Sequence, residues 1–309
     1  MVCVMMSTFN GERYIYEQIN SIIKQNIDKL ILLIRDDGST DRTVNIIKSF
    51  YGELPSNRKI ELIVGNNIGV ERSFYELVYY ARKNIAPCKY YAFSDQDDIW
   101  DCDKISTAIR YLDRMDMDTP NLYYSNLRVV DSELNFIRNK FDYGYVKDST
   151  EFIAAEMCAW GCTCVFNFKA LDEMSKIEYM HFLAHDNWIL WLCAFCGECV
   201  YDEEPHILYR QHGNNVSGQV KFGVDKFVQY IKKISNIFSF RPEFEPRARL
   251  LLHLYNENLT ASNRKILEQI AFYKKNFLSR IKLLFSMRIS SGHIPKEIGR
   301  RIRIVLGDL

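Results

Sequence analysis

Apolar residues follow two alternating patterns in the first hundred residues of the chain. Short apolar runs at residues 2–6, 30–34, 60–64 and 90–93 are typical of buried strands. Between these runs, the apolar residues recur at helical spacing. In the first interval they are Ile15, Ile19, Ile22 and Ile23, and in the third they are Phe74, Leu77, Val78 and Ala81. The alternation predicts an α/β fold with a Rossmann-type, mostly parallel sheet that helices cover on both faces.

Polar segments follow the four predicted strands at their carboxyl ends. In chain order they read STFN, RDDGSTD, NNIGVERS and SDQDDIW. In open parallel sheets, ligands bind in the crevice beyond the carboxyl ends of the strands. The pattern therefore predicts that these four loops meet at one binding crevice. In the second loop, Ser39 or Thr40 is a suitable N-cap for the next helix, with Asp41 in its first turn.

Beyond residue 150 the pattern is mixed. Residues 162–168 and 198–201 are predicted strands, and residues 186–196 a buried helix. After residue 220 two apolar stripes at helical spacing indicate helices. The first comprises Ile266, Ile270, Tyr273, Phe277, Ile281 and Leu284; the second comprises Ile298, Ile302, Val305 and Leu306, with Arg300, Arg301 and Arg303 between its members. We expect one domain over residues 1–220 and a basic helical extension over residues 221–309.

Charge is distributed unevenly along the chain, although the net charge is only +1. Residues 221–309 hold 18 Lys and Arg against 7 Asp and Glu, whereas residues 1–220 hold 22 against 32. The asymmetry indicates an acidic body, whose carboxylates suit a metal ion, and a basic tail that suits an anionic surface. An apolar content of 48% is enough for a core and excludes a disordered or collagen-like chain.

The sequence favours a cytoplasmic location. No targeting segment precedes the first apolar run, and the longest apolar stretch, residues 188–196, is far shorter than the ~20 residues of a membrane-spanning helix. Nine cysteines, an odd number, indicate reduced thiols. Cys193, Cys196 and Cys199 have metal-binding spacing, but their apolar neighbours favour packing in the core.

Three carboxylates cluster in SDQDDIW, directly after an apolar strand. Asp95, Asp97 and Asp98 lie within four residues, and carboxylates this close repel each other unless a cation or basic group is present. Mg²⁺ and Mn²⁺ bind one or two protein carboxylates and complete their shell with substrate phosphates. The alternative is a solvated acidic turn before a helix near Asp101. The position at a strand end favours the metal site.

The four polar segments, extended to STFNGERY, RDDGSTD, NIGVERSF and SDQDDIW, resemble the nucleotide-sugar domain of family 2 glycosyltransferases. That family has the GT-A fold and transfers sugars with inversion. SDQDDIW, GCTCVFN, HDNW and LYRQHGNNVSG are similar to a bacterial rhamnosyltransferase-type branch that builds cell-surface polysaccharides. The resemblance spans roughly residues 2–218, so it implies that the domain over residues 1–220 binds the nucleotide sugar and carries catalysis.

The resemblance implies roles for individual residues. The nucleotide pocket would be lined by Thr8, Asn10 and Glu12, and Asp36 would accept a hydrogen bond from N3–H of uracil or thymine. The turn after the second strand would be shaped by Asp37 and Ser39, and Arg72 would reach the diphosphate. Asp95 would hold the ribose or the metal shell, and Asp97 would bind Mn²⁺ or Mg²⁺ directly. Each has an alternative. Asn10-Gly11 and Asp36-Asp37-Gly38 also suit simple turns, and Arg72 suits an exposed first helical turn.

Two later segments bear on the mechanism. An inverting transfer needs a base for the acceptor hydroxyl, and Asp186 at the start of the helix at residues 186–196 is the candidate. Its alternative role is to cap that helix. His212 is either a further metal ligand or an ordinary loop residue. Arg210 either neutralises the diphosphate or is structural, and Asn214-Asn215 belong to a loop predicted to fold over the donor.

These features lead to a functional hypothesis. We expect an inverting, metal-dependent transferase whose donor is a dTDP- or UDP-sugar, with dTDP-L-rhamnose implied by the resemblance. The acceptor would be a saccharide or a lipid-linked saccharide of the cell surface. The basic tail would contact the membrane, and the alternative is that its apolar stripes pack on the catalytic domain or on a second subunit. The alternatives are a catalytically silent sugar-nucleotide-binding or scaffold subunit and a nucleotidyltransferase. Nucleic-acid binding is disfavoured because the tail shows no aromatic stacking platform.

Overall fold

The computed structural model of the chain describes residues 1–212, 243–286, 289–290, 292–307 and 309. These residues form two compact units. The N-terminal unit comprises Met1–Asp148 and Ala159–Gln211, and the C-terminal unit comprises Ser149–Cys158 and the residues described from His212 onward. The expected boundary between residues 220 and 221 lies outside the described residues, so that division stays a prediction.

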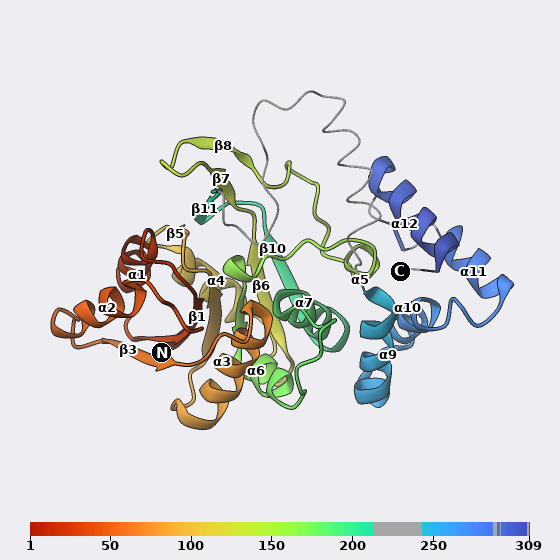
Figure 1. The fold of residues 1–309 in the computed structure, drawn as a ribbon. Coiled ribbons are helices and arrows are strands. Elements are labelled where there is room, and N and C mark those ends of the chain that lie inside the picture. Colours follow the sequence, from red (N-terminus) through yellow and green to blue (C-terminus); the bar gives the residue numbers. More distant parts are fainter. Residues whose placement is uncertain (213–242, 287–288, 291, 308) are drawn as a thin grey trace. The chain divides into compact units, whose positions relative to one another are not determined.

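A seven-stranded sheet forms the centre of the N-terminal unit, in the order β10-β6-β9-β4-β1-β2-β3 (Figure 1). Its strands are β1 (Val2–Thr8), β2 (Leu30–Asp36), β3 (Arg58–Val64), β4 (Tyr90–Ser94), β6 (Asn121–Ser125), β9 (Val165–Asn167) and β10 (Glu198–Asp202). All neighbouring pairs are parallel except those of β9, which runs antiparallel to β4 and β6. The expected mostly parallel sheet is confirmed.

Helices pack on the sheet because its strands are apolar on both faces. They are α1 (Ile15–Ile23), α2 (Thr43–Ser49), α3 (Val70–Asn84), α4 (Lys104–Leu112), α6 (Phe168–Ser175) and α7 (His185–Cys196), with short 3-10 turns η1 (Phe50–Gly52) and η2 (Gly161–Thr163). Val2, Val4 and Met6 of β1 belong to the core shared with α1, α2 and α4. Residues between them face the other side, where α3 packs against β1.

A second, four-stranded sheet has the order β5-β11-β7-β8. Its strands are β5 (Ile99–Trp100), β11 (Ile207–Arg210), β7 (Arg128–Val130) and β8 (Phe136–Asn139). Leu208 of β11 pairs with Ile99 of β5 and with Arg128 of β7. This sheet therefore brings the chain around Arg210 beside the loop that follows β4.

Two local expectations are wrong. The first four strands lie where predicted, but residues 162–168 do not form one strand: Gly161–Thr163 is a 3-10 turn, and after the short β9 the side chain of Asn167 caps α6 by accepting from Ala170 N (3.0 Å). Neither Ser39 nor Thr40 caps α2, which begins at Thr43. Asp41 Oδ1 instead accepts from Thr43 N (2.9 Å), and the Ser39 hydroxyl donates to Asp36.

The C-terminal unit is helical in its described residues. It contains α5 (Thr150–Ile153), α9 (Phe244–Tyr255), η3 (Asn256–Asn258), α10 (Ala261–Ala271), α11 (Phe277–Leu284) and α12 (Ile294–Leu306). The first predicted apolar stripe is not continuous, because the chain leaves the helix between α10 and α11. Ile266 and Ile270 are buried, whereas Phe277 is 76% exposed. Among the described helices, none has both the length and the hydropathy of a membrane span.

The second predicted stripe lies on α12 and faces outward. Ile294, Ile298, Ile302, Val305 and Leu306 are exposed large apolar side chains. On the same helix, Arg300 and Arg303 are buried, and Arg300 Nη2 pairs with Glu297 Oε2 at 2.8 Å. The arginines therefore do not all line the apolar stripe as expected: Arg301 is exposed, but Arg300 and Arg303 pack inward.

Candidate functional site

The loops that follow β1 and β4 are joined by Gln96, a residue to which the sequence assigned no role. Thr8 Oγ1 donates to Gln96 Oε1 (2.7 Å), Phe9 N donates to the same oxygen (2.9 Å), and Gln96 Nε2 donates to Phe9 O (3.1 Å). A Cβ atom at Gly11 would lie 2.3 Å from that oxygen, so glycine leaves the space in which the Gln96 amide makes these bonds. The carboxyl ends of the strands meet as expected for a parallel sheet.

The loop after β1 also binds the loop after β2. Asn10 Oδ1 accepts from Thr40 N (2.9 Å). Glu12 Oε2 accepts from the backbone N–H of Arg42 (3.0 Å) and from its Nε (3.1 Å), and these bonds lower the pKa of Glu12. Asn10 and Glu12 therefore order the crevice wall, and their contact with a nucleotide stays a prediction.

Asp36 and Asp37 are adjacent and buried but have different partners. Asp36 accepts from Ser39 N (2.9 Å) and from Ser39 Oγ (2.5 Å), which shapes the turn after β2. Asp37 accepts from the Arg35 guanidinium and from the backbone N–H groups of Ile68 and Gly69 (2.9 Å each). Asp37 thus holds the segment that leads into α3, which favours a structural role over direct contact with the nucleotide.

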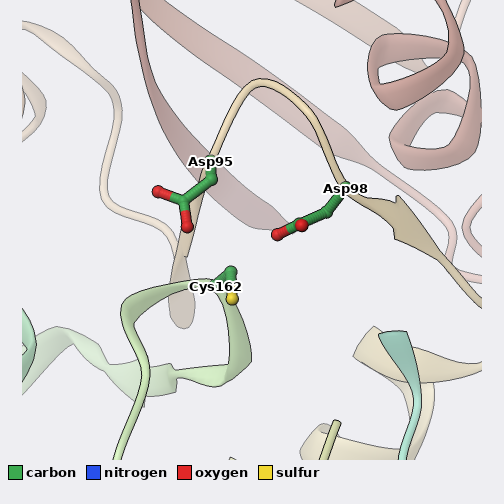
Figure 2. A group of neighbouring side chains, drawn as sticks. All are labelled: Asp95, Asp98 and Cys162. Carbon is green, nitrogen blue, oxygen red and sulfur yellow. The ribbon is translucent and has the colours of Figure 1, made fainter. Parts of the chain in front are cut away.

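Two carboxylates and a thiol converge beyond β4. Asp95, Asp98 and Cys162 each offer one ligand atom, and these atoms lie within 4.8 Å of one another. Figure 2 shows both carboxyl groups on the loop after β4, with Cys162 of η2 opposite them. Burial and the charge of Asp97 raise the pKa of Asp95 to about 7, and the same two causes raise the pKa of Asp98. A cation would relieve this repulsion.

The carboxylate oxygens of the loop after β4 are suitable ligands for a hard divalent ion. Carboxylates suit Mg²⁺ and Mn²⁺, whereas the Cys162 thiol is a soft ligand. Burial raises the pKa of the Cys162 thiol well above its usual value, which keeps it protonated. Asp97 lies between the two convergent carboxylates in the sequence, and its predicted ligand role stays a prediction.

Arg210 is 3% exposed and holds the loop after β4 in place. Its backbone N–H donates to Asp98 Oδ1 (3.2 Å), and its Nε donates to Asp97 O (3.0 Å). The guanidinium also donates to Ser132 O (2.7 Å) and to Glu17 Oε2 (2.5 Å). These bonds use protein acceptors, which favours the structural role for Arg210 over contact with a diphosphate.

The first turn of α7 carries Asp186, the candidate base. Its Oδ1 accepts from the backbone N–H of Asn187 (2.6 Å) and from Asn187 Nδ2 (2.9 Å). The ring of His185, the residue before Asp186, meets the ring of Phe93 of β4 edge-on at a centroid separation of 4.9 Å, so the start of α7 lies beside the strand that leads into SDQDDIW. The charge of Asp186 also raises the pKa of Asp95. The N-cap position belongs to Ala184, so Asp186 is not the N-cap residue.

His185 is buried at this helix start. Its Nδ1 lies 3.0 Å from Glu71 Oε2. Burial lowers the pKa of His185, but the charge and hydrogen bond of Glu71 outweigh that effect and raise it. Glu71 has no predicted role in the sequence analysis; the only signal for it there is its place in NIGVERSF, next to Arg72.

The remaining predicted residues lie at the margin of the described site. Arg72 is exposed in the first turn of α3. His212 is partly buried and is the last residue described before the gap at residues 213–242. Asn214 and Asn215, predicted to fold over the donor, lie outside the described residues. The roles of these residues stay predictions.

Sequence comparison identifies the family. The family model described as "Glycosyl transferase family 2" matches residues 3–175, more than half of the chain. The dTDP-rhamnosyl transferase RfbG of Shigella flexneri is 34% identical over 230 residues, which cover 69% of this chain and 73% of the relative. Both findings agree with the resemblance carried by the strand-end segments.

Comparison of structures gives the same fold. Residues 1–349 of S. aureus TarS, in complex with UDP-GlcNAc, match with a TM-score of 0.59 and 17% identity, covering 98% of this chain and 81% of that TarS chain. The Pyrobaculum calidifontis mannosyltransferase PcManGT, in complex with GDP-Man and Mn²⁺, matches with a TM-score of 0.54 and 14% identity, covering 100% of this chain and 88% of the other. The expected GT-A fold is confirmed, and the chain is a glycosyltransferase that belongs to glycosyl transferase family 2.

Proposed function

We propose that the chain transfers a sugar from a nucleotide diphosphate donor with inversion, and that the transfer depends on Mg²⁺ or Mn²⁺. The observation that carries the proposal is the convergence, at one sheet edge, of the carboxylates after β4 and the first turn of α7. Asp95 belongs to the group that could hold a cation, and the charge of Asp186 acts on it. A metal site and a general base at one crevice suit a direct displacement.

The proposed donor is dTDP-L-rhamnose. Support comes from the printed name of the Shigella flexneri relative, which is a dTDP-rhamnosyl transferase. TarS and PcManGT bind UDP-GlcNAc and GDP-Man, so the fold accommodates different nucleotide sugars. Thr8, Asn10, Glu12 and Asp36 are proposed to line the nucleoside side of the pocket.

In the proposed mechanism Asp186 acts on the acceptor. Its carboxylate takes the proton of the acceptor hydroxyl as the oxygen attacks the anomeric carbon, and the nucleoside diphosphate leaves from the opposite side. Asp97 and Asp95 would hold the cation, which supplies positive charge to the leaving diphosphate. Gln96 and Arg210 keep the loop that carries these carboxylates in one conformation. The displacement forms no covalent intermediate with the enzyme.

The proposed acceptor is a lipid-linked saccharide at the inner face of the cytoplasmic membrane. The outward apolar face of α12 supports this, because exposed apolar side chains beside cations suit a membrane interface. Lys275, Lys282 and Arg301 are exposed cations on or next to α11 and α12. The enzyme would then work in the cytoplasm at the membrane surface.

The proposal is tested by incubating the purified full chain with a panel of nucleotide sugars and measuring nucleoside diphosphate release. We expect release from dTDP-L-rhamnose that needs Mg²⁺ or Mn²⁺, stops with EDTA and rises when a lipid-linked saccharide is added. Faster release from another donor would overturn the choice of sugar. Donor binding without release under any condition would identify a catalytically silent subunit.

A further inference from the structure

The start of α7 is held by a carboxylate that comes from a different helix. Glu71, in the first turn of α3, accepts from the backbone N–H of His185 (2.9 Å) and lies 3.0 Å from His185 Nδ1, both through Oε2. The two residues are 114 positions apart in the sequence. One oxygen thus fixes both the backbone and the side chain of the first residue of α7.

This carboxylate takes the place of a local helix cap. The first N–H groups of a helix have no partner within the helix, and polar side chains at the N-cap position usually accept from them. The N-cap of α7 is Ala184, whose methyl group cannot accept a hydrogen bond. Glu71 supplies both the acceptor and a negative charge at the positive end of the helix.

The imidazole of His185 has little room to move. It stacks on the ring of Phe74 with a centroid separation of 3.9 Å, and the ring of Phe93 meets it edge-on at 4.9 Å. A Cβ atom at Gly161 would lie 2.5 Å from His185 Nε2. The ring is therefore enclosed by α3, β4 and η2, and its position fixes the backbone from which Asp186 extends.

We propose that Glu71 is a positioning residue for transfer: through His185 it sets the orientation of the first turn of α7, and hence of the Asp186 carboxylate. The inference rests on the proposed function, in which Asp186 is the base. Glu71 would act on the geometry of the site through the two contacts of its Oε2 with His185, whereas Asp186 takes the acceptor proton in the proposed function. Small displacements of a reacting group are costly: a shift of ~1 Å can lower a rate about 100-fold.

The test is the full-length Glu71→Gln variant, assayed with the donor that the wild type uses. The amide is of similar size but removes the negative charge that faces His185. We expect kcat to fall about tenfold or more while the KM for the donor stays within about twofold of wild type. Glu76→Gln, the same change five residues further along α3, is the matched control and should keep wild-type kcat.

A double-mutant cycle with Asp186→Asn separates positioning from general destabilisation. If Glu71 acts through Asp186, Glu71→Gln should lower the residual rate of Asp186→Asn by less than about twofold. An equal loss in both backgrounds, or wild-type kcat for Glu71→Gln, overturns the inference. A fully active Asp186→Asn enzyme contradicts the proposed base instead. His185→Gln provides the same test should Glu71→Gln not fold, which thermal unfolding would reveal.

Discussion

The acidic residues of SDQDDIW differ in their surroundings although they are close in sequence. Asp98 is fully buried, and its Oδ1 is held by the backbone N–H of Arg210. Asp95 is half-buried, and its pKa is raised to about 7 by burial and by the charge of Asp97. The same side chain therefore stands in different surroundings: one oxygen of Asp98 is bonded to the backbone at Arg210, while Asp98 and Asp95 both belong to the group that could hold a cation.

Replacing Asp97 by asparagine tests the metal assignment. An amide cannot replace the charge of the carboxylate, so Asp97→Asn should abolish transfer and remove most of the metal-dependent affinity for the donor. The fold should survive, because the substitution relieves repulsion within the loop. Isothermal titration with and without Mn²⁺ measures the affinity, and Asp118→Asn, an exposed carboxylate elsewhere, is the control. Normal turnover of Asp97→Asn in Mn²⁺ would show that the metal is bound differently.

Replacing Asp186 by asparagine separates catalysis from a purely local role. General-base catalysis contributes on the order of 10²–10⁴-fold, so if Asp186 is the base, Asp186→Asn should lose about that much in transfer while binding donor and metal normally. Slow hydrolysis of the donor should be less affected. If Asp186 only stabilises the first turn of α7, asparagine should keep near-normal activity, and Asp186→Ala should lose about 0.3–1 kcal/mol of stability. Single-turnover transfer assays and chemical denaturation distinguish these outcomes.

At the scale of elements, close contacts between backbones fix where strands begin. Gly197 ends α7 and leads directly into β10. A Cβ atom at this position would lie 1.9 Å from the carbonyl oxygen of Pro120, which precedes β6. Since β6 and β10 pair along their length, this backbone has little freedom to shift. The glycine therefore lets the buried helix turn into the sheet without displacing its neighbour.

Gly197→Ala should destabilise the protein by about 1–3 kcal/mol or more, because an added methyl group must displace packed backbone. Gly52, at the end of η1, has no atom within 4 Å of the position of a Cβ. Gly52→Ala is therefore the matched control and should be neutral or stabilise by up to ~1 kcal/mol. Urea denaturation measures the free energy of unfolding of both variants. Similar stability for the two variants would contradict the steric argument.

Patterns local to the sequence could be predicted, whereas contacts between distant segments could not. The strands containing Met5, Leu32 and Phe93 are continuous apolar runs, and a polar segment follows each of them. These two features predict the sheet and the crevice at its edge. The pairing of Glu71 with His185 joins residues 114 positions apart, and no spacing rule signals such a contact. The start of α2 differs from the prediction for another reason. Several polar residues near it could accept from the first N–H groups of the helix, and the Ser39 hydroxyl donates to Asp36.

The orientation of α12 also lay beyond the sequence pattern. Its period identifies an amphipathic helix but not the face that packs on the protein. In the structure, Arg300, Arg303 and Ile304 are buried, whereas Ile294, Ile298 and Ile302 are exposed, so the wider apolar face of the helix is turned to solvent. A helix so oriented leaves apolar surface for a further contact.

At the scale of the whole molecule, the charge asymmetry agrees with a division of tasks. The carboxylates of residues 1–220 suit a metal-dependent crevice, and the basic excess of residues 221–309 suits an anionic surface. Each cation near an anionic membrane leaflet contributes about 1 kcal/mol to binding, so three exposed cations give a substantial but salt-sensitive attraction. Apolar side chains on the same helices would add a contribution that salt does not screen.

The outward face of α12 is the place to test membrane contact. Deleting residues 295–309 should weaken binding to anionic liposomes and leave donor binding intact, but it also removes the buried arginines. The double variant Ile298→Asn/Val305→Asn changes the exposed face alone; these side chains are 54% and 56% exposed. Burying an aliphatic side chain contributes about 1.5–3 kcal/mol, so even partial insertion of both predicts a loss of about tenfold or more in liposome binding.

The matched control for this variant is Phe136→Asn/Val64→Asn, which removes side chains that are 62% and 59% exposed in the N-terminal unit. Co-sedimentation with vesicles that contain anionic lipid measures both variants, with donor affinity as a check that the site is intact. We expect the α12 variant to bind weakly and the control to bind as the wild type does. Because apolar insertion resists salt, the difference should persist at high ionic strength, where the attraction of the lysines and arginines is screened. Equal liposome binding by wild type and the α12 variant would mean that another surface makes the contact, or that the acceptor is reached without the membrane.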